Sequence, residues 1–349
     1  MNNNRAIVIS FLIFTSIYLF SCSRDAIVTP NNPVNFTIHG AYIVCEGTFS
    51  TSPGLSFYDF RTGAFTQNVF HPGTPAPFAN GLVINNSSLY MTSKGISGAG
   101  EVYKLDTLGN VISSSALNNS PAGIANVFDK LFVSTGPDSS VTVLNSSTLN
   151  VNKKIKAGYF PDEILNYGDR IFVCNSQTVG GLSDNRVTVI DAFADTVLKQ
   201  VRVSLLPTSI ALSNDKQILV GCKRSGNAVM YKIDPFSLTV SDSIIIPTGF
   251  VSDISVDRST DNIYFIQDAN HIASLDFVSR NVVTALTVSD PGAVINSYAF
   301  DYEARKHCIG AAYTISLNGK FLVYNIDTNL EHTFETLAGP VRIVIKNTF

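Results

Sequence analysis

The sequence of 349 residues contains no tryptophan, and charged residues make up only 15% of it. Its lysines and arginines form no cluster and the formal net charge is −3, so nucleic acid is not expected as a partner. Long runs of helical periodicity are also missing, because apolar residues recur at every second position in short stretches. With 45% hydrophobic residues and 23 glycines, these absences favour an all-β protein with a large core and many turns.

The motifs of metal centres and of common active sites are absent as well. The five histidines form neither H-x-H nor H-E-x-x-H, and the cysteines form no C-x-x-C. There is no G-x-S-x-G elbow, and no glycine-rich phosphate loop follows a strand. We therefore expect no metal, no cofactor and no catalytic residue, and we favour a protein that is not an enzyme.

The N-terminus has the features of a lipoprotein signal. Arg5 precedes the apolar stretch Ala6 to Phe20, which is short for a transmembrane helix and typical of a signal peptide. The next residues, "LFSC", end at Cys22 and resemble the bacterial lipobox, which implies cleavage before this cysteine and its lipidation. Residues 1–21 are thus predicted to be a signal peptide, and residues 22–40, rich in Pro and Asn, a flexible tether.

These features predict a lipid-anchored protein of the cell envelope, in the outer membrane, with the surface and the periplasmic leaflet both left open. The lipid anchor is expected to be its only contact with the membrane. The alternative is a plain signal peptide followed by a chance cysteine.

An aspartate or asparagine recurs at one point of a repeating unit, directly behind a run of β-forming residues such as "VTVI". A polar turn and a second strand follow it each time. Asp and Asn side chains accept hydrogen bonds from the backbone of tight turns, so we predict structural turn residues rather than catalytic ones. The seven positions, spaced 39 to 51 residues apart, are Asp59, Asp106, Asn145, Asp191, Asp234, Asp276 and Asp327.

Each repeating unit contains four short strands in about 45 residues, which is typical of the blade of a β-propeller. The first recognisable strand, "AYIVCEG", matches the second strand of a unit, and the last, "GPVRIVIKN", matches a first strand. The C-terminal strand should therefore complete the first blade and remove two exposed sheet edges. Residues 41–349 are predicted to form one all-β, seven-bladed β-propeller of four-stranded antiparallel blades.

The units "LFVSTGPDSSVTVLNSSTLNV" and "RVTVIDAFADTVLKQVRVSLLPTSIALS" resemble the YVTN-type, YncE-like propeller repeat. "GAYIVCEGTFSTSPGLSFYDFRTGAF" resembles the opening of the Bacteroidetes surface lipoproteins of that group. Without tryptophan there is no WD dipeptide, no Asp-box ending in Trp and no Trp-docking motif, so other propellers fit less well. The resemblance covers residues 41–347 and implies the architecture rather than a particular ligand.

Four cysteines lie within the predicted propeller. Cys45, Cys174 and Cys222 are expected at the last core position of the second strand in three blades, with Cys308 two places earlier in its own. Equivalent positions of different blades should lie further apart than the ~4.4–6.8 Å Cα separation of a disulfide. We expect buried free thiols.

Two sets of loops meet at one face of a propeller: those between successive blades and those joining second to third strands. In this sequence their residues differ between blades while turn and core positions repeat, which leaves room for recognition. The mixture of aromatic and polar side chains suits an organic ligand or a protein surface. The ligand-binding candidates are Glu46, Phe49, Lys94, Asn175, Gln177, Glu163, Lys223, Asp253, Gln267, Tyr313 and Arg342.

We therefore expect a membrane-anchored, non-catalytic binding lipoprotein that captures a small organic ligand or a partner protein at this face. Some lipoproteins of the group it resembles capture corrinoids and pass them to a TonB-dependent transporter, which makes a corrinoid one candidate ligand and such a transporter one candidate partner here. One alternative is a scaffold that contacts another envelope protein. The other is a lactonase-like hydrolase, which would need a general base and an electrophile together on the same face.

Overall fold

The computed structural model describes residues 39–70, 78–85, 88–95, 98–106, 109–176, 183–223, 226–247, 250–313 and 318–347. The chain divides into two units, and all of these residues belong to the second, residues 32–349. The predicted signal peptide, Cys22 and nearly all of the predicted tether lie outside the described residues.

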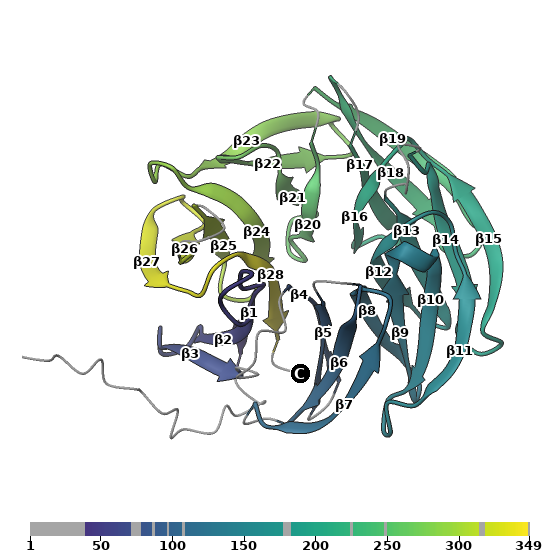
Figure 1. The fold of residues 1–349 in the computed structure, drawn as a ribbon. Helices are drawn as coiled ribbons and strands as arrows, with labels where there is room; N and C mark the ends of the chain where they lie inside the picture. The colour runs from purple at the N-terminus through teal and green to yellow at the C-terminus, as the bar shows by residue number, and fades with distance from the viewer. Residues whose placement is uncertain are drawn as a thin grey trace, which may run out of the picture. The chain divides into compact units, whose positions relative to one another are not determined.

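Within the described ranges, twenty-eight strands form seven four-stranded antiparallel sheets, arranged as blades around a common centre (Figure 1). Seven innermost strands surround this centre: β28 (Pro340–Lys346), β4 (Ala79–Asn85), β8 (Pro121–Val127), β12 (Pro161–Tyr167), β16 (Pro207–Leu212), β20 (Ser252–Val256) and β24 (Val294–Asp301). We number the blades 1 to 7 in this order. The predicted seven-bladed β-propeller is confirmed.

The remaining strands follow the inner ones outwards in each blade. The second strands are β1 (Gly40–Cys45), β5 (Ser88–Lys94), β9 (Lys130–Thr135), β13 (Arg170–Asn175), β17 (Ile218–Cys222), β21 (Ile263–Ile266) and β25 (Lys306–Ala312). The third strands are β2 (Gly54–Asp59), β6 (Gly100–Leu105), β10 (Ser140–Asn145), β14 (Arg186–Asp191), β18 (Ala228–Asp234), β22 (His271–Asp276) and β26 (Lys320–Asn325).

The outer strands are β3 (Phe65–Phe70), β7 (Val111–Leu117), β11 (Val151–Lys156), β15 (Thr196–Arg202), β19 (Thr239–Ile246), β23 (Asn281–Thr287) and β27 (Leu330–Glu335). The one helical turn among the described residues is a short 3-10 helix, Gly136–Asp138. None of the helical structure described is long and apolar enough to cross a membrane.

Second and third strands are buried along nearly their whole length, because neighbouring blades cover both of their faces. This explains why the sequence shows continuous apolar runs such as "IFVC" there, whereas the outer strands are mostly exposed. The largest fully buried side chains include Tyr42, Phe132, Phe172, Phe265 and Phe321.

The C-terminal strand β28 pairs with β1, so the first blade is built from both ends of the chain. Gly40 lies opposite Lys346 and Val44 opposite Arg342 in an antiparallel register. This is the predicted closure of the ring, and it satisfies the edge of β1 that would otherwise stay open.

The recurring aspartates lie at the ends of third strands, where their side chains hold the turn to the outer strand. Asp191 Oδ1 accepts hydrogen bonds from the N–H groups of Phe193 (2.8 Å) and Ala194 (2.9 Å). The same pattern occurs at Asp59, Asn145, Asp234 and Asp276, while Asp106 accepts from the backbone of Asn110.

The seventh blade requires a correction, because Asn325 rather than Asp327 occupies this position. Asn325 is the last residue of β26, and its side chain accepts the N–H of Asn329 at 3.0 Å. The prediction chose the aspartate two residues later, since carboxylates occupied nearly all the other positions.

Cys45, Cys174, Cys222 and Cys308 are all buried free thiols, as expected. Their places in the blades need one correction. Cys45 lies opposite Pro340 and Cys222 opposite Pro207, but Asn175 rather than Cys174 has the corresponding place opposite Pro161. Cys174 is therefore one residue earlier in its strand than the other two.

Candidate functional site

The inner strands begin and the second strands end at the same end of the propeller, which we call the loop face. In blade 4, for example, Pro161 at the start of β12 pairs with Asn175 at the end of β13. Most inner strands carry a β-bulge near their start, which directs extra side chains towards the channel or the neighbouring blade.

In each inner strand, one residue near the start directly precedes the first core side chain. The seven residues at this position form a ring at the loop face. In four blades the residue at this position is small and packs against the next blade. A Cβ on Gly81 or Gly123 would collide with the backbone of the next blade. The hydroxyls of Ser209 and Ser297 form hydrogen bonds with the backbone of the blade that follows theirs. In the other three blades the residue is charged: Glu163, Asp253 and Arg342. All three are predicted ligand-binding residues, and the structure brings them together.

Arg342 and Glu163 form a bidentate ion pair. Nη1 of the guanidinium donates to Oε2 at 3.0 Å and Nη2 donates to Oε1. Arg342 belongs to β28 in blade 1 and Glu163 to β12 in blade 4, so the pair crosses the centre of the ring (Figure 1). Their side chains are only 22% and 21% exposed.

Two further carboxyl groups lie in the field of this pair. Burial raises the pKa of Asp253 to about 7, with Arg342 acting against the rise and Glu163 adding to it. Burial likewise raises the pKa of Asp162, opposed by Lys94 and Arg342. The backbone of Asp253 has φ +47°, a left-handed conformation that costs energy in a residue other than glycine.

A cavity of about 490 Å³ follows the channel axis and is lined by inner strands of all seven blades. Glu163, Asp253 and Arg342 lie towards its opening at the loop face, and Arg258 and Tyr302 towards the opposite end. Cavities that bind small organic molecules are typically of this size. The Arg342–Glu163 pair therefore lies at the loop-face end of this cavity.

A second cavity of about 210 Å³ opens between blades 7 and 1 and contains two more predicted residues, Glu46 and Tyr313. Burial raises the pKa of Glu46, and Lys94 opposes this. The hydroxyl of Tyr313 donates to Asp290, which also accepts from Lys320 Nζ at 2.9 Å. Tyr313 is therefore held in a fixed orientation.

Apolar side chains surround these polar groups at the loop face. Phe49 is 64% exposed and packs edge-to-face on Phe78, with ring centroids 5.2 Å apart. Lys223 places its ammonium 5.1 Å from the ring centroid of Phe250. Tyr159 and Leu205 add exposed apolar surface on other blades.

Three of the predicted ligand-binding residues remain: Asn175, Gln267 and Gln177. Asn175 is fully buried, and its amide donates to Arg186 O (2.9 Å) and Thr188 Oγ1 (3.0 Å), so it supports the fold and cannot meet a ligand. Gln267 is partly buried directly after β21, with its backbone bonded to His271. Gln177 lies outside the described residues. Asp162, next to Glu163 at the start of β12, also belongs to the site, as do Asn296 and Asp290, which were not predicted.

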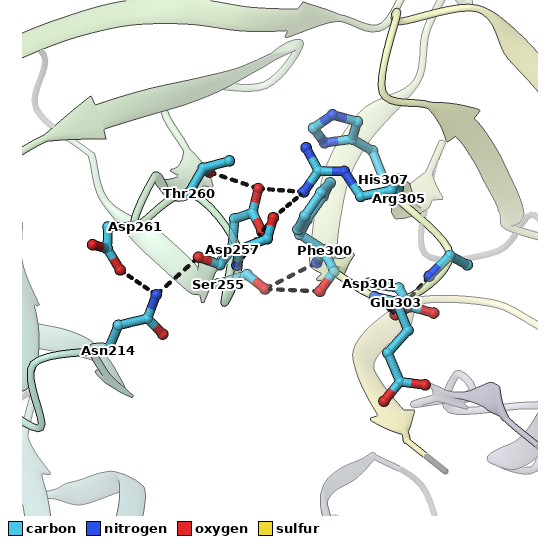
Figure 2. A network of polar contacts seen from close by, with 12 residues as sticks. Asn214, Ser255, Asp257, Thr260, Asp261, Phe300, Asp301, Glu303, Arg305 and His307 are labelled. Atoms are coloured by element: carbon cyan, nitrogen blue, oxygen red, sulfur yellow. Dashed lines mark hydrogen bonds and ion pairs between the residues drawn. The ribbon is translucent and has the colours of Figure 1, made fainter.

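A polar network at the opposite end was also not predicted (Figure 2). Arg305 Nη1 contacts Asp257 Oδ2 at 2.5 Å, and Thr260 donates to the same oxygen at 2.7 Å. Asn214 donates to the backbone oxygen of Asp257 at 3.1 Å, so side chains of blades 5, 6 and 7 are joined. Asp257 is fully buried, and the network serves to connect blades. Among the described residues no group of three or more His, Cys, Asp or Glu is placed to hold a metal ion.

Solved structures show the same fold. A quinoprotein alcohol dehydrogenase-like protein from Bacteroides thetaiotaomicron has a TM-score of 0.70 and 13% identity, covering 90% of this chain and 79% of its own. A 6-phosphogluconolactonase-like protein from Bacteroides uniformis has a TM-score of 0.66 and 13% identity, covering 88% and 99%. Hydrazine synthase from Kuenenia stuttgartiensis has a TM-score of 0.65 and 16% identity, covering 76% and 88%.

At these identities the likeness shows the fold alone. No family model matches this chain, and no curated protein matches it in sequence.

Proposed function

We propose that this protein is a membrane-anchored binding protein that captures a small organic ligand at the loop face. The observation that carries the proposal is the charged group of Arg342, Glu163 and Asp253 at the loop-face end of a cavity, with exposed aromatic side chains elsewhere on the same face. Such a surface suits a ligand that has an apolar body and several hydrogen-bonding groups.

The charges are not required by the fold, which supports a role in recognition. Four of the seven blades have Gly or Ser at the same position, and these small residues pack against the next blade. Replacing a buried ion pair with apolar residues is often neutral or stabilising, so the pair is weak evidence for a stabilising role. The raised pKa of Asp253 and the positive φ of its backbone add to the cost of this arrangement.

A corrinoid is the specific ligand that we propose, from the resemblance to Bacteroidetes propeller lipoproteins, with a TonB-dependent transporter as partner. A corrinoid combines a broad apolar macrocycle with peripheral amides, which matches the mixed surface. The test is calorimetry and corrinoid absorption spectra on the purified full chain mixed with cobalamin and related corrinoids. Binding weaker than millimolar contradicts capture of a corrinoid.

Variants then locate the site. Exchanging four loop-face charges for glutamine, two acidic and two basic, should weaken binding at least tenfold: Glu46→Gln, Glu163→Gln, Lys223→Gln and Arg342→Gln. A matched control removes the same balance of charge at the opposite end: Asp261→Asn, Glu331→Gln, Lys216→Gln and Arg61→Gln. Equal affinity in both variants contradicts this face as the site. A scaffold role towards another envelope protein then becomes the leading proposal.

Anchoring through Cys22 is proposed from the lipobox-like sequence. Several acyl chains on one cysteine would hold a protein far more firmly than one, at ~0.8 kcal/mol per buried methylene. Cys22→Ala should release the folded chain from membranes, as measured by detergent phase partition and circular dichroism. A variant that still enters the detergent phase like the wild type contradicts lipidation.

A lactonase-like hydrolase is the second proposal. The observation in its favour is Asp253, a carboxyl group with a pKa near 7, in the field of the Arg342 guanidinium. A general base works best with a pKa near the working pH, and a guanidinium can stabilise a developing oxyanion. The test is to measure the rate at which sugar lactones open, from the acid that is released, with wild type and with Asp253→Asn. Equal rates with and without the protein contradict it.

A further inference from the structure

Exposed apolar side chains are concentrated at the end of the propeller opposite the loop face. We call this end the turn face, because the turns between first and second and between third and outer strands lie there. Of the seventeen large apolar side chains exposed among the described residues, twelve lie in these turns or in the first half of an outer strand. They are Val111, Ile112, Phe128, Val151, Phe193, Val197, Leu198, Phe236, Val240, Val278, Val283 and Leu330.

Four of them project from the turns of successive blades, 3 to 6. Their exposed fractions are 60% for Phe128, 81% for Phe193, 69% for Phe236 and 95% for Val278. Single exposed apolar residues are common on proteins, but exposed apolar side chains on four successive blades of one face indicate a contact surface.

The turns that carry these side chains are fixed by polar contacts. Asp191 binds the N–H of Phe193, and Lys130 of the preceding blade donates to Phe193 O at 3.2 Å. Arg170 donates in the same way to Phe236 O at 3.0 Å. The backbone of these turns is therefore fixed. Arg170 also lies 5.8 Å from the centroid of the Phe236 ring, and Lys130 beside Phe193 is paired with Asp195.

Phe128 adds a second, independent observation. It occupies the left-handed position of its turn with φ +56°, which is costly for a bulky residue. The left-handed residue of the same turn in other described blades is Gly168, Lys216, Asp261 or Arg305. An apolar ring that is both exposed and in a costly conformation indicates a function beyond the fold.

The chain also enters the propeller at the turn face. His39 directly precedes β1, and its ring packs on Phe60 with centroids 4.8 Å apart, while its Nε2 contacts Asp301 at 2.5 Å. Cys22 lies 17 residues before His39. At about 3.3–3.6 Å per extended residue, a bilayer that holds Cys22 is at most roughly 60 Å from this face.

We propose that the turn face of blades 3 to 6 rests on the lipid bilayer that holds the N-terminus, with Phe128, Phe193, Phe236 and Val278 in the interfacial layer. The inference rests on the anchoring proposed above and adds a direct protein contact to it. In this position the loop face points away from the bilayer and takes up ligand, and the propeller must leave the bilayer to pass the ligand to a membrane transporter. Aromatic side chains flanked by lysine and arginine are the type of surface that lies at a membrane interface.

The absence of tryptophan makes a direct test possible, because one substitution introduces the only indole of the chain. The full chain is reconstituted in phosphatidylcholine vesicles as Phe193→Trp and, separately, Phe236→Trp. Phe49→Trp, on the loop face and 64% exposed, is the matched control. In vesicles of brominated lipid, emission of the turn-face indoles should shift to the blue and fall at least twofold, while the control stays unchanged.

Flotation of the same samples reports anchoring separately from this contact. Protein that floats but shows equal quenching at Phe193→Trp and Phe49→Trp overturns the contact and leaves the anchor intact. Protein that does not float overturns the anchor and this inference together. If the Phe193→Trp protein floats, its indole is not quenched and the protein binds a second protein instead, the turn face is a protein-docking surface.

Discussion

Arg342 of the last strand and Glu163 of blade 4 form a bidentate ion pair across the channel, although 179 residues separate them. β28 also closes the ring by pairing with β1. The same strand thus completes the fold and supplies the only cation in the ring of charges formed by Glu163, Asp253 and Arg342. Stability and binding should therefore respond together to changes in β28.

Removing the guanidinium should destabilise the protein, because Glu163, Asp162 and Asp253 then face one another without it. For Arg342→Met we expect a loss of about 1–3 kcal/mol in the free energy of unfolding at pH 8, below the range for fully buried pairs because both side chains are partly exposed. Urea unfolding measures it. The double variant Arg342→Met/Glu163→Gln should recover part of the loss. If the double variant loses as much free energy of unfolding as Arg342→Met and Glu163→Gln lose separately when added together, the pairing is contradicted.

Removing the closing strand should prevent a stable ring. A chain that ends at Pro340 loses Ile343, which is 7% exposed, and leaves β1 with an open edge. We expect the melting temperature to fall by more than 10 °C or the cooperative transition to disappear. The control ends at Lys346 and keeps the whole of β28. An unchanged melting temperature in the shorter chain contradicts closure by this strand.

Asp253 should make stability depend on pH. Its pKa is about 7 in the folded protein and near 3.8 in a free chain, so between these values the folded state holds a proton that the unfolded state has lost. The free energy of unfolding therefore falls as pH rises from about 4 to 7, by at most about 1.4 kcal/mol for each unit of pKa difference.

Asp253→Asn removes this dependence. The variant should be more stable than the wild type at pH 8 and equal to it at pH 4, as measured by urea unfolding. The lowered pKa of the buried His307, about 4, affects both proteins alike and cancels in the difference. The exposed Asp327→Asn serves as control. A constant difference between wild type and Asp253→Asn across this range contradicts the raised pKa.

Phe128→Gly should stabilise the fold, because glycine adopts the left-handed conformation without the steric cost of a side chain. We expect a gain of about 1 kcal/mol in urea unfolding. Gly168, at φ +58° in the matching turn of blade 4, provides the reverse test, since Gly168→Phe should cost a similar amount. A loss of stability in Phe128→Gly contradicts strain at this position.

The architecture could be predicted from the sequence because it depends on local features that recur. Asp191 and its counterparts mark turns by accepting hydrogen bonds from backbone N–H groups two to four residues along, and seven such turns define seven blades. The one misplaced turn residue, Asp327, arose where the true residue, Asn325, lacks the usual charge. Closure followed from two incomplete units at the ends of the chain.

The site was only partly predictable, since its contacts join distant blades. The starts of inner strands pointed to Glu163, Asp253 and Arg342, but a pair across the ring depends on which blades face one another. Asn175 looked like a rim residue because it is polar and follows a strand, yet its amide bonds inside the blade. The left-handed conformation of Phe128 could not be predicted, because nothing in the residue types around "DK" indicates it.

The pairing of β28 with β1 has a consequence for biosynthesis. β1 is made before the strands of the other six blades and its partner β28 after them, so blade 1 stays incomplete until β28 has left the ribosome. Until then the free edge of β1 is exposed to pairing with other chains. A chain that stops before Pro340 lacks β28 and cannot complete blade 1, so the closing strand is a built-in check against such truncated products.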